Sequence, residues 1–178
     1  MRGVVRDKEA TKANLLDAAM DEFAQYGLAG ARVDRIAAKA GCNKAMIYAY
    51  FGSKERLYDE LLKIQIDRMI QQVPITPDDL PGYAGRLFDS YRDQPRLLRL
   101  AAYHRLENGF EAIPEAEAEA YRHKVEAIGL AQMEGKISAE FNANDLLDMV
   151  VHMSILAFTT PNATRALVER SVSRLIAE

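Results

Sequence analysis

The stretch AGCNKAMIYAYFGSK, residues 40–54, decides the fold of this chain. Gly41 predicts the end of one helix, because a residue without a Cβ adopts the left-handed conformation at a helix end without penalty. Asn43 is a good N-cap for a second helix. In that helix Ile47 and Phe51 lie four residues apart, which gives a narrow apolar seam against the helix before it. The stretch therefore predicts two helices joined by a tight turn.

The flanking residues extend this pattern in both directions. Upstream, apolar residues recur at intervals of three and four, so residues 33–40 are predicted to form a short amphipathic helix. Downstream, Gly52 ends the second helix, Ser53 can cap a third, and Glu55 is favourably placed in the first turn of that third helix. A helix, a glycine turn and a short helix are typical of a helix-turn-helix motif, whose second helix enters the major groove of DNA.

The outward face of the second helix would be unusual for a helix that meets only water. A solvated face normally carries Glu, Lys and Gln, whereas this face would carry aromatic and small side chains, at Lys44, Ala45, Met46, Tyr48, Ala49 and Tyr50. Small side chains permit a close approach to a groove, and tyrosine hydroxyls can donate hydrogen bonds to phosphate oxygens. The face is therefore predicted to contact DNA.

Three segments of the chain resemble one known family. They are LLDAAMDEFAQYG (15–27), VDRIAAKAG (33–41) and NKAMIYAYFGSKERLYDELL (43–62). Over about residues 11–62, roughly the first third of the chain, the sequence is similar to the DNA-binding domain of the TetR family of bacterial transcriptional repressors. These motifs are specific enough to make chance similarity a poor explanation.

Two positions depart from the family pattern. Many members carry Thr before the valine that opens the second helix of the domain, where this chain has Ala31 and Arg32. A hydroxyl cap and phosphate donor is therefore missing, and Arg32 could replace the phosphate contact with a charged one. Valine is common in the family where Cys42 stands, and cysteine can act there as a small buried hydrophobe.

The resemblance implies an all-α fold in two parts. Residues 1–54, extending to about 62 with the start of a linking helix, would form an N-terminal three-helix helix-turn-helix DNA-binding domain. Residues 55–178 would form a C-terminal helical ligand-binding and dimerisation domain. The implied function is that of a sequence-specific transcriptional regulator, a dimeric repressor that a small-molecule ligand releases from a palindromic operator. Such a protein is not an enzyme and needs no cofactor.

The residues expected to contact DNA can be sorted by role. Phosphate contacts position a protein without selecting sequence, and the candidates are Lys54, Tyr48, Tyr50, Arg32 and Thr11. Lysine can donate to guanine and apolar groups can meet thymine methyls, so the base-reading candidates are Lys44, Ala45, Met46 and Ala49. Met46 could instead flank the helical core. Together with helix-opening positions, the predicted DNA-binding set is Thr11, Arg32, Val33, Asn43, Lys44, Ala45, Met46, Tyr48, Ala49, Tyr50 and Lys54.

The charge distribution supports an anion-facing N-terminal part, although the whole chain has a net charge of −3. Residues 1–57 hold ten Lys and Arg against seven Asp and Glu, so this part is +3 and the remainder is −6. Four basic residues near the start, Arg2, Arg6, Lys8 and Lys12, could form an arm along or into the minor groove. A frayed, solvated terminus is the alternative.

The rest of the chain is predicted to be helical. Apolar spacing and the positions of Pro and Gly predict helices over 55–73, 80–93 or 83–93, from Pro95 to the segment NGFEAIP (108–114), 114–134, 145–159 and 161–177. Residues 74–82 contain three prolines and a glycine and are predicted to be a connection. Alternating glutamates at 115–119 are expected to be a solvated stretch, with an acidic functional site as the alternative.

The two terminal helices need a partner surface, because residues 145–159 are apolar on more than one face. The resemblance implies that they pair with their copies in a four-helix bundle and form a two-fold homodimer. A dimer would place two recognition helices in successive major grooves, about 34 to 36 Å apart or a multiple of that, which predicts a palindromic double-stranded DNA operator. Two helices that simply fill a monomer core are the alternative.

A small molecule would act on the C-terminal domain, as the resemblance implies. It would shift the spacing of the two DNA-reading helices, which requires only that the ligand has different affinities for the two states. An apolar pocket with a few phenols and imidazoles suits a flat, hydrophobic or aromatic effector. The candidate pocket residues, each of which could instead be a core residue, are Met69, Tyr91, Tyr103, His104, Tyr121, Met149, His152 and Met153.

Enzymatic and metal-binding functions find little support in the sequence. The nearest constellation is His104 with Glu107 or Glu111, and its spacing places His104 and Glu107 on one helix face. No third ligand stands nearby in the sequence and no helical H-E-x-x-H motif occurs. No catalytic residue and no metal site are therefore predicted. His152, on an apolar helix, is expected to be a hydrogen-bonded core residue.

Two alternative functions are a thiol sensor and an adaptor protein. A thiol sensor at Cys42 would make the regulator redox-responsive, but the position should be buried and no second cysteine can resolve an oxidised one. An adaptor that keeps the fold without binding DNA would not need Lys44, Tyr48, Tyr50 and Lys54.

Length and composition suit a globular protein inside the cell. The 178 residues are 49% apolar, and a single cysteine excludes an internal disulfide and a multi-cysteine metal site. No apolar run reaches the roughly 18 residues needed to cross a bilayer. The N-terminal residues also lack the apolar stretch of a secretory signal. We therefore expect a cytoplasmic protein with no membrane partner.

Overall fold

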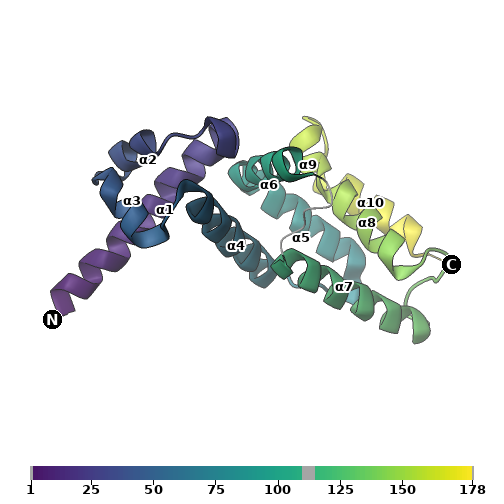
Figure 1. The fold of residues 1–178 in the computed structure, drawn as a ribbon. Helices are drawn as coiled ribbons and strands as arrows, with labels where there is room; N and C mark the ends of the chain where they lie inside the picture. The colour runs from purple at the N-terminus through teal and green to yellow at the C-terminus, as the bar shows by residue number, and fades with distance from the viewer. Residues whose placement is uncertain (1, 110–114, 178) are drawn as a thin grey trace. The chain divides into compact units, whose positions relative to one another are not determined.

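The computed structural model describes residues 2–109 and 115–177, and the regular structure in this part of the chain is helical throughout, which confirms the predicted all-α fold. The elements, labelled in Figure 1, are α1 (Arg2–Gly30), α2 (Val33–Ala40), α3 (Lys44–Phe51), α4 (Lys54–Gln72), η1 (Pro77–Asp79), α5 (Leu80–Asp93), α6 (Pro95–Asn108), α7 (Glu115–Met133), α8 (Ala143–Ser154), α9 (Leu156–Thr159) and α10 (Arg165–Leu175).

The helices form two compact units. Unit 1 contains residues up to 65 together with α6 from Arg96, and unit 2 contains residues 66–95 together with α7 to α10. Two helices link the units along the chain: α4 continues from unit 1 into unit 2, and a single residue, Gln94, separates α5 from α6. The predicted division after Lys54 therefore differs from this grouping, because α6 joins the N-terminal helices.

Unit 1 is built around one apolar core. Its fully buried side chains come from α1, α2, α3, α4 and α6, and include Leu15, Ala19, Phe23, Ile36, Ile47, Leu57, Leu61 and Leu100. Phe23 meets the ring of Tyr58 edge-on, with ring centroids 5.0 Å apart. These contacts hold α3 by one side and leave its other side facing outward.

The helix-turn-helix forms as the sequence predicts. The bounds predicted for α2, residues 33–40, are confirmed, and Gly41 ends that helix in the left-handed conformation (φ 68°). The amide of Cys42 donates to the carbonyl of Ala37 at 3.0 Å and so closes the turn. Asn43 caps α3 as predicted, because its side-chain oxygen accepts a hydrogen bond from the amide of Ala45 at 2.9 Å.

Two features of the first helix could not be placed from the sequence. It begins at Arg2, so the backbone of the basic N-terminal residues is helical. Near its other end Gly27 has φ 67° and ψ 179°, a conformation that is essentially restricted to glycine, and it kinks the chain before Leu28.

Unit 2 is organised around α5. This helix packs against α8, α9 and α10, and α7 packs against α8. Figure 1 shows α5, α7, α8 and α10 running beside one another. The buried side chains of α5 are Leu80, Tyr83, Ala84, Leu87, Phe88 and Tyr91. Between α5 and α10, Arg165 donates to Asp89 at 2.7 Å, and within α10 it also donates to Glu169 at 2.7 Å.

The helix predicted over 80–93 is confirmed, but two other predicted boundaries in unit 2 are wrong. The predicted connection 74–82 contains η1 and the start of α5, because Asp79 caps the helix by accepting from the amide of Gly82 at 2.9 Å. Pro81 is tolerated there, since the first turn of a helix needs no amide donor. The final helix begins at Arg165, after the cap Thr164, and not at residue 161.

The predicted helix 145–159 is also interrupted. Helix α8 ends at Ser154 and α9 begins two residues later. The buried hydroxyl of Ser154 donates to the carbonyl of Val150 at 2.8 Å, and the carbonyl of Ala84 on α5 lies 3.1 Å from the same oxygen. A serine that bonds back to the preceding turn tends to bend a helix, which accounts for the break.

Candidate nucleic-acid interface

The outward face of α3 is the most distinctive surface of unit 1. Ile47 and Phe51 are buried and hold the helix against the core. On the opposite side Tyr48 is 50% exposed. The other predicted contact residues of α3 are also accessible: Lys44, Ala45 and Ala49 are exposed, and Met46 and Tyr50 are half-buried. The outer side of α3, with its small and aromatic residues, is therefore accessible and has the shape needed to fit a DNA major groove.

Lys44 is held by a carboxylate on the neighbouring helix. Its Nζ lies 3.0 Å from Oδ1 of Asp34 on α2. The hydrogen bond to Asp34 and the negative charge of that residue raise the pKa of Lys44. The ammonium has further donors besides the one that meets Asp34.

Arg32 and Val33 stand at the start of α2. Arg32 is exposed and occupies the N-cap position without capping the helix through its side chain, and Val33 is half-buried. The N-terminus of a helix favours anions, because the unpaired amides and the helix dipole are positive there. An exposed guanidinium at that end gives the position a second source of positive charge.

Glu22 fixes the turn that leads into α2. It is only 7% exposed, and its Oε1 accepts from the amide of Arg32 at 2.8 Å and from Nε of Arg35 at 2.8 Å. Burial acts to raise the pKa of Glu22, but the hydrogen bonds from Arg35 and Arg32 outweigh it and lower the pKa. Glu22 is not among the residues predicted from the sequence. Its position within an apolar stretch of α1 is the one feature of the sequence that indicates this role.

Lys54 has an internal role. Its Nζ donates to the carbonyl of Leu28 at 2.7 Å and to that of Ala31 at 3.2 Å, and it lies partly buried. Two of its three donors therefore stabilise the turn between α1 and α2. Thr11 is half-buried on α1, and next to it Lys12 forms an ion pair with Glu60 at 2.6 Å.

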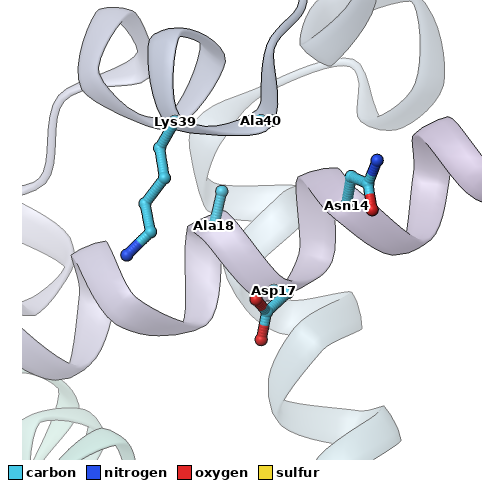
Figure 2. A pocket seen from close by; sticks show the side chains of 5 residues that line it. All are labelled: Asn14, Asp17, Ala18, Lys39 and Ala40. Carbon is cyan, nitrogen blue, oxygen red and sulfur yellow. The ribbon is translucent and has the colours of Figure 1, made fainter.

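Figure 2 shows a hollow between α1 and α2, lined by Asn14, Asp17, Ala18, Lys39 and Ala40. Its lining is mainly polar, and the Lys39 ammonium is paired with Asp21, which also accepts from Arg96 at 2.6 Å. The hollow lacks the apolar walls of a small-molecule site. We assign it no binding role.

The predicted ligand-binding residues divide between the two units. Tyr103 and His104 lie on α6 in unit 1, where the Tyr103 hydroxyl lies 3.5 Å from the Gln25 carbonyl and the His104 ring stacks on Tyr58 with centroids 6.0 Å apart. The structure thus gives both residues contacts with the N-terminal helices. The remaining candidates, all in unit 2, are Met69, Tyr91, Tyr121, Met149, His152 and Met153.

Within unit 2 these candidates differ in burial. Tyr91 is buried, while Met69, Tyr121, Met149 and Met153 are half-buried. Burial, together with a 3.0 Å hydrogen bond to Asp148, raises the pKa of Tyr121 to about 12. The expectation that His152 is a core residue is wrong: the side chain is exposed and lies 2.7 Å from the carbonyl of Asp148, one turn earlier on its own helix.

The residues considered for a metal, catalytic or thiol site have other surroundings in the structure. Across residues 2–109 and 115–177, no cluster of His, Cys, Asp and Glu could hold a metal ion. The Glu107 carboxylate accepts from the amides of Leu28 and Ala29, at 3.2 and 3.1 Å, so it stabilises the kink at Gly27 near the end of α1. Glu111 lies outside the described residues. Cys42 is half-buried, although a buried position was expected.

A search for membrane spans in the described part of the chain found no helix both long and apolar enough to cross a bilayer.

The capped α2–α3 pair and the outward face of α3 define a helix-turn-helix DNA-binding protein. Residues 15–61 match the family described as bacterial regulatory proteins, tetR family. Residues 79–175 match the family described as tetracyclin repressor-like, C-terminal domain. The chain belongs to the TetR family of transcriptional regulators, which are not enzymes.

Individual relatives support this assignment along nearly the whole chain. The HTH-type transcriptional repressor SCO4008 of Streptomyces coelicolor is 44% identical over 165 residues, which cover 92% of this chain and 86% of SCO4008. The HTH-type transcriptional regulator RutR of Escherichia coli is 33% identical over 101 residues, covering 53% of this chain and 48% of RutR. The crystal structure of SCO4942 from Streptomyces coelicolor superposes with a TM-score of 0.83 at 30% identity, covering 93% of this chain and 98% of that one. The chain is thus a helix-turn-helix transcriptional regulator of the TetR family.

Proposed function

We propose that two copies of this chain bind a palindromic operator and that a small-molecule effector releases them. The observation that carries the proposal is the exposed side of α3, which presents Tyr48, Ala45 and Ala49 on a helix anchored by two buried side chains. This arrangement suits insertion into a major groove. Because the operator is part of the genome, the protein would act in the cytoplasm.

The proposed DNA contacts keep the predicted roles with one revision. Lys44, Ala45, Met46 and Ala49 would read base edges, and Tyr48, Tyr50 and Arg32 would contact phosphates. Thr11, Val33 and Asn43 would lie at the edge of the interface, where Asn43 mainly stabilises the start of α3. Lys54 would act chiefly through the carbonyls it binds, because these hold the turn that positions α2.

The proposed dimer would form through α8 and α10, with α9 beside them. Helices α8 and α10 each bury one side in unit 2, whereas α9 has no buried residue. Leu167 on α10 is 42% exposed and Phe158 on α9 is 43% exposed. Covering such residues favours association, and a two-fold axis between copies would pair the same surface with itself.

The proposed link from effector to DNA is α6. The tetracyclin repressor-like C-terminal match spans this helix, yet its contacts lie with the N-terminal helices. Besides Glu107 at the kink, Arg96 bonds Asp21, and the Tyr58 hydroxyl donates to the carbonyl of Leu100 at 3.2 Å. Since only Gln94 separates α6 from α5, a ligand that shifts α5 would strain these contacts and alter the placement of α1 and α4.

Selection of bound fragments from random double-stranded DNA tests the proposal directly. We expect an enriched palindrome bound by two protein chains, with an affinity that falls steeply as salt rises. A light-scattering measurement on the free and bound protein gives the number of chains. Enrichment of an asymmetric site bound by one chain would refute the dimer, and binding without sequence preference would refute operator recognition.

A further inference from the structure

A buried phenol in unit 2 has no hydrogen-bond partner. Tyr83, on α5, is 0% exposed, and its hydroxyl is buried with no acceptor or donor within reach among the described residues. Leaving such a group unsatisfied costs roughly 1–3 kcal/mol, and buried tyrosine hydroxyls usually find a partner. An orphaned hydroxyl in a folded protein calls for an explanation, such as a bound group that the protein is built to hold.

A lysine reaches the same tyrosine from another helix. Nζ of Lys124, on α7, lies 5.7 Å from the centre of the Tyr83 ring. Within the part of the chain that the structure describes, this ammonium forms no ion pair or hydrogen bond. Burial lowers the pKa of Lys124, and the charge of Glu117, earlier on α7, opposes that effect only in part. The side chain is half-buried, so its charge is partly removed from water.

The surroundings make this pair more than a chance contact. Helices α5 and α7 both pack against α8, and beside Tyr83 the buried face of α5 carries Leu80, Ala84 and Leu87. In such apolar surroundings a charged partner interacts more strongly than it would in water. Burial also raises the pKa of Tyr83, so its hydroxyl remains protonated and can donate. The Tyr83 hydroxyl thus lacks an acceptor, and the Lys124 ammonium lies over the ring that carries it.

We propose that Lys124 and Tyr83 bind the acidic group of the effector, which is a small organic anion with an apolar body. One carboxylate oxygen accepts the hydrogen bond from the Tyr83 hydroxyl, and the negative charge pairs with the Lys124 ammonium. An uncharged ester of the same shape leaves that ammonium unpaired and binds more weakly. The role as effector rests on the proposed function, whereas the binding of the anion does not.

Calorimetric titration with matched pairs of compounds tests the site. The probes are octanoate, benzoate and salicylate, each compared with its methyl ester. We expect at least one acid to bind the native protein about tenfold more tightly than its ester, as a charge-assisted contact requires. Lys124→Met should abolish that preference, and Tyr83→Phe should reduce it severalfold. Lys136→Met removes an exposed lysine of unit 2 that pairs with Asp78 and Glu134, and should leave the preference unchanged.

Stability measurements separate a lost site from a lost fold. Tyr83→Phe removes the orphaned hydroxyl, so without ligand this variant should unfold at the same or a higher urea concentration than the native protein. Three results would overturn the proposal: equal binding of acids and esters, binding of none of the acids, or a preference that persists in Lys124→Met. In each case an ordered water would be the partner of the two donors. Operator affinity is measured separately with each bound acid. An acid that binds without changing it would refute the effector role and leave the site standing.

Discussion

Glu107 Oε2 accepts a hydrogen bond from the amide of Leu28 at 3.2 Å, joining the last turns of α6 to the kink that follows the main part of α1. The two residues are 79 positions apart in the sequence. The other carboxylate oxygen serves the next amide, that of Ala29. One side chain therefore satisfies two amides that the non-helical Gly27 leaves without helical partners.

Replacing Glu107 should loosen this junction. Glu107→Ala removes both acceptors, and because the site is exposed and water can replace them, we expect a loss of about 1 kcal/mol in the free energy of unfolding. Urea denaturation measures it. Glu119→Ala, an exposed glutamate on α7, is the matched control and should change stability by less than about 0.5 kcal/mol. Equal effects of the two substitutions would show that the carboxylate does not hold the kink.

Gly27 should be intolerant of a side chain. Its backbone lies where only glycine is comfortable, and a Cβ there would sit 2.7 Å from Glu107 Oε1 and 3.0 Å from the Tyr103 ring. We expect Gly27→Ala to cost about 1–3 kcal/mol. Gly129→Ala, within α7, adds a Cβ whose nearest neighbour is the Ala143 Cβ at an ordinary contact distance of 4.0 Å, and it should instead stabilise by about 0.4–1 kcal/mol. Thermal unfolding of both variants checks the opposite signs.

Lys54 and Arg32 should differ in their effect on the salt dependence of operator binding. Lys54→Met removes the bonds to Leu28 and Ala31, so it should lower stability and affinity while leaving the salt slope unchanged. Arg32→Gln removes an exposed charge and should reduce the slope by about one. Affinities measured between 50 and 200 mM salt, roughly the range over which such slopes are resolved, distinguish the two. A reduced slope for Lys54→Met would restore it as a phosphate contact.

Substitutions at Lys44 and Tyr48 should have different effects, one on the preferred DNA sequence and the other on overall DNA affinity. Lys44→Ala removes a proposed base contact and should change which operator is selected from a random pool. Tyr48→Phe removes a proposed phosphate donor and should weaken binding to all sequences alike. The readout is a repeat of the selection with each variant. The same enriched site for Lys44→Ala and the native protein would contradict the assignment.

The free energy of unfolding should decrease at acidic pH, in part because Glu22 becomes protonated. Because its pKa is lowered in the folded protein, the carboxylate contributes stability at neutral pH that is lost as the pH falls below the ordinary pKa of a glutamate, about 4.3, and through the lower folded value. Glu22→Gln should be less stable at pH 7 and should lose less stability between about pH 5 and pH 3. Urea denaturation at several pH values measures this. Parallel curves for the two proteins would contradict the assigned pairing.

Local signals account for what the sequence predicted well. The bounds of α2 and the Asn43 cap follow from residues within one or two turns, so the neighbouring sequence was sufficient to place them. The break after Ser154 also depends on the carbonyl of Ala84, 70 positions away, and could not be read from periodicity. The hydrogen bonds of Lys54 also could not be predicted from local sequence. The sequence predicts a phosphate contact for this residue, whereas its ammonium donates to carbonyls of a turn more than 20 residues earlier.

The fold divides the predicted pocket residues between the two units. The sequence prediction places Tyr103 and His104 in the C-terminal domain, whereas their contacts lie with α1 and α4. Tyr83 and Lys124 were overlooked because one appears in sequence as an ordinary aromatic core residue and the other as an ordinary surface cation. Only the folded chain shows that one lacks a partner and that the other lies over its ring.

The ion pair between Lys44 and Asp34 has a consequence for how the protein searches along DNA. With Lys44 in the proposed base-reading role, the Asp34 carboxylate would compete with DNA for the ammonium, so a contact at a random site would gain less binding free energy than a contact with a well-matched base. Asp34→Asn should then yield a regulator that remains longer on the wrong sites.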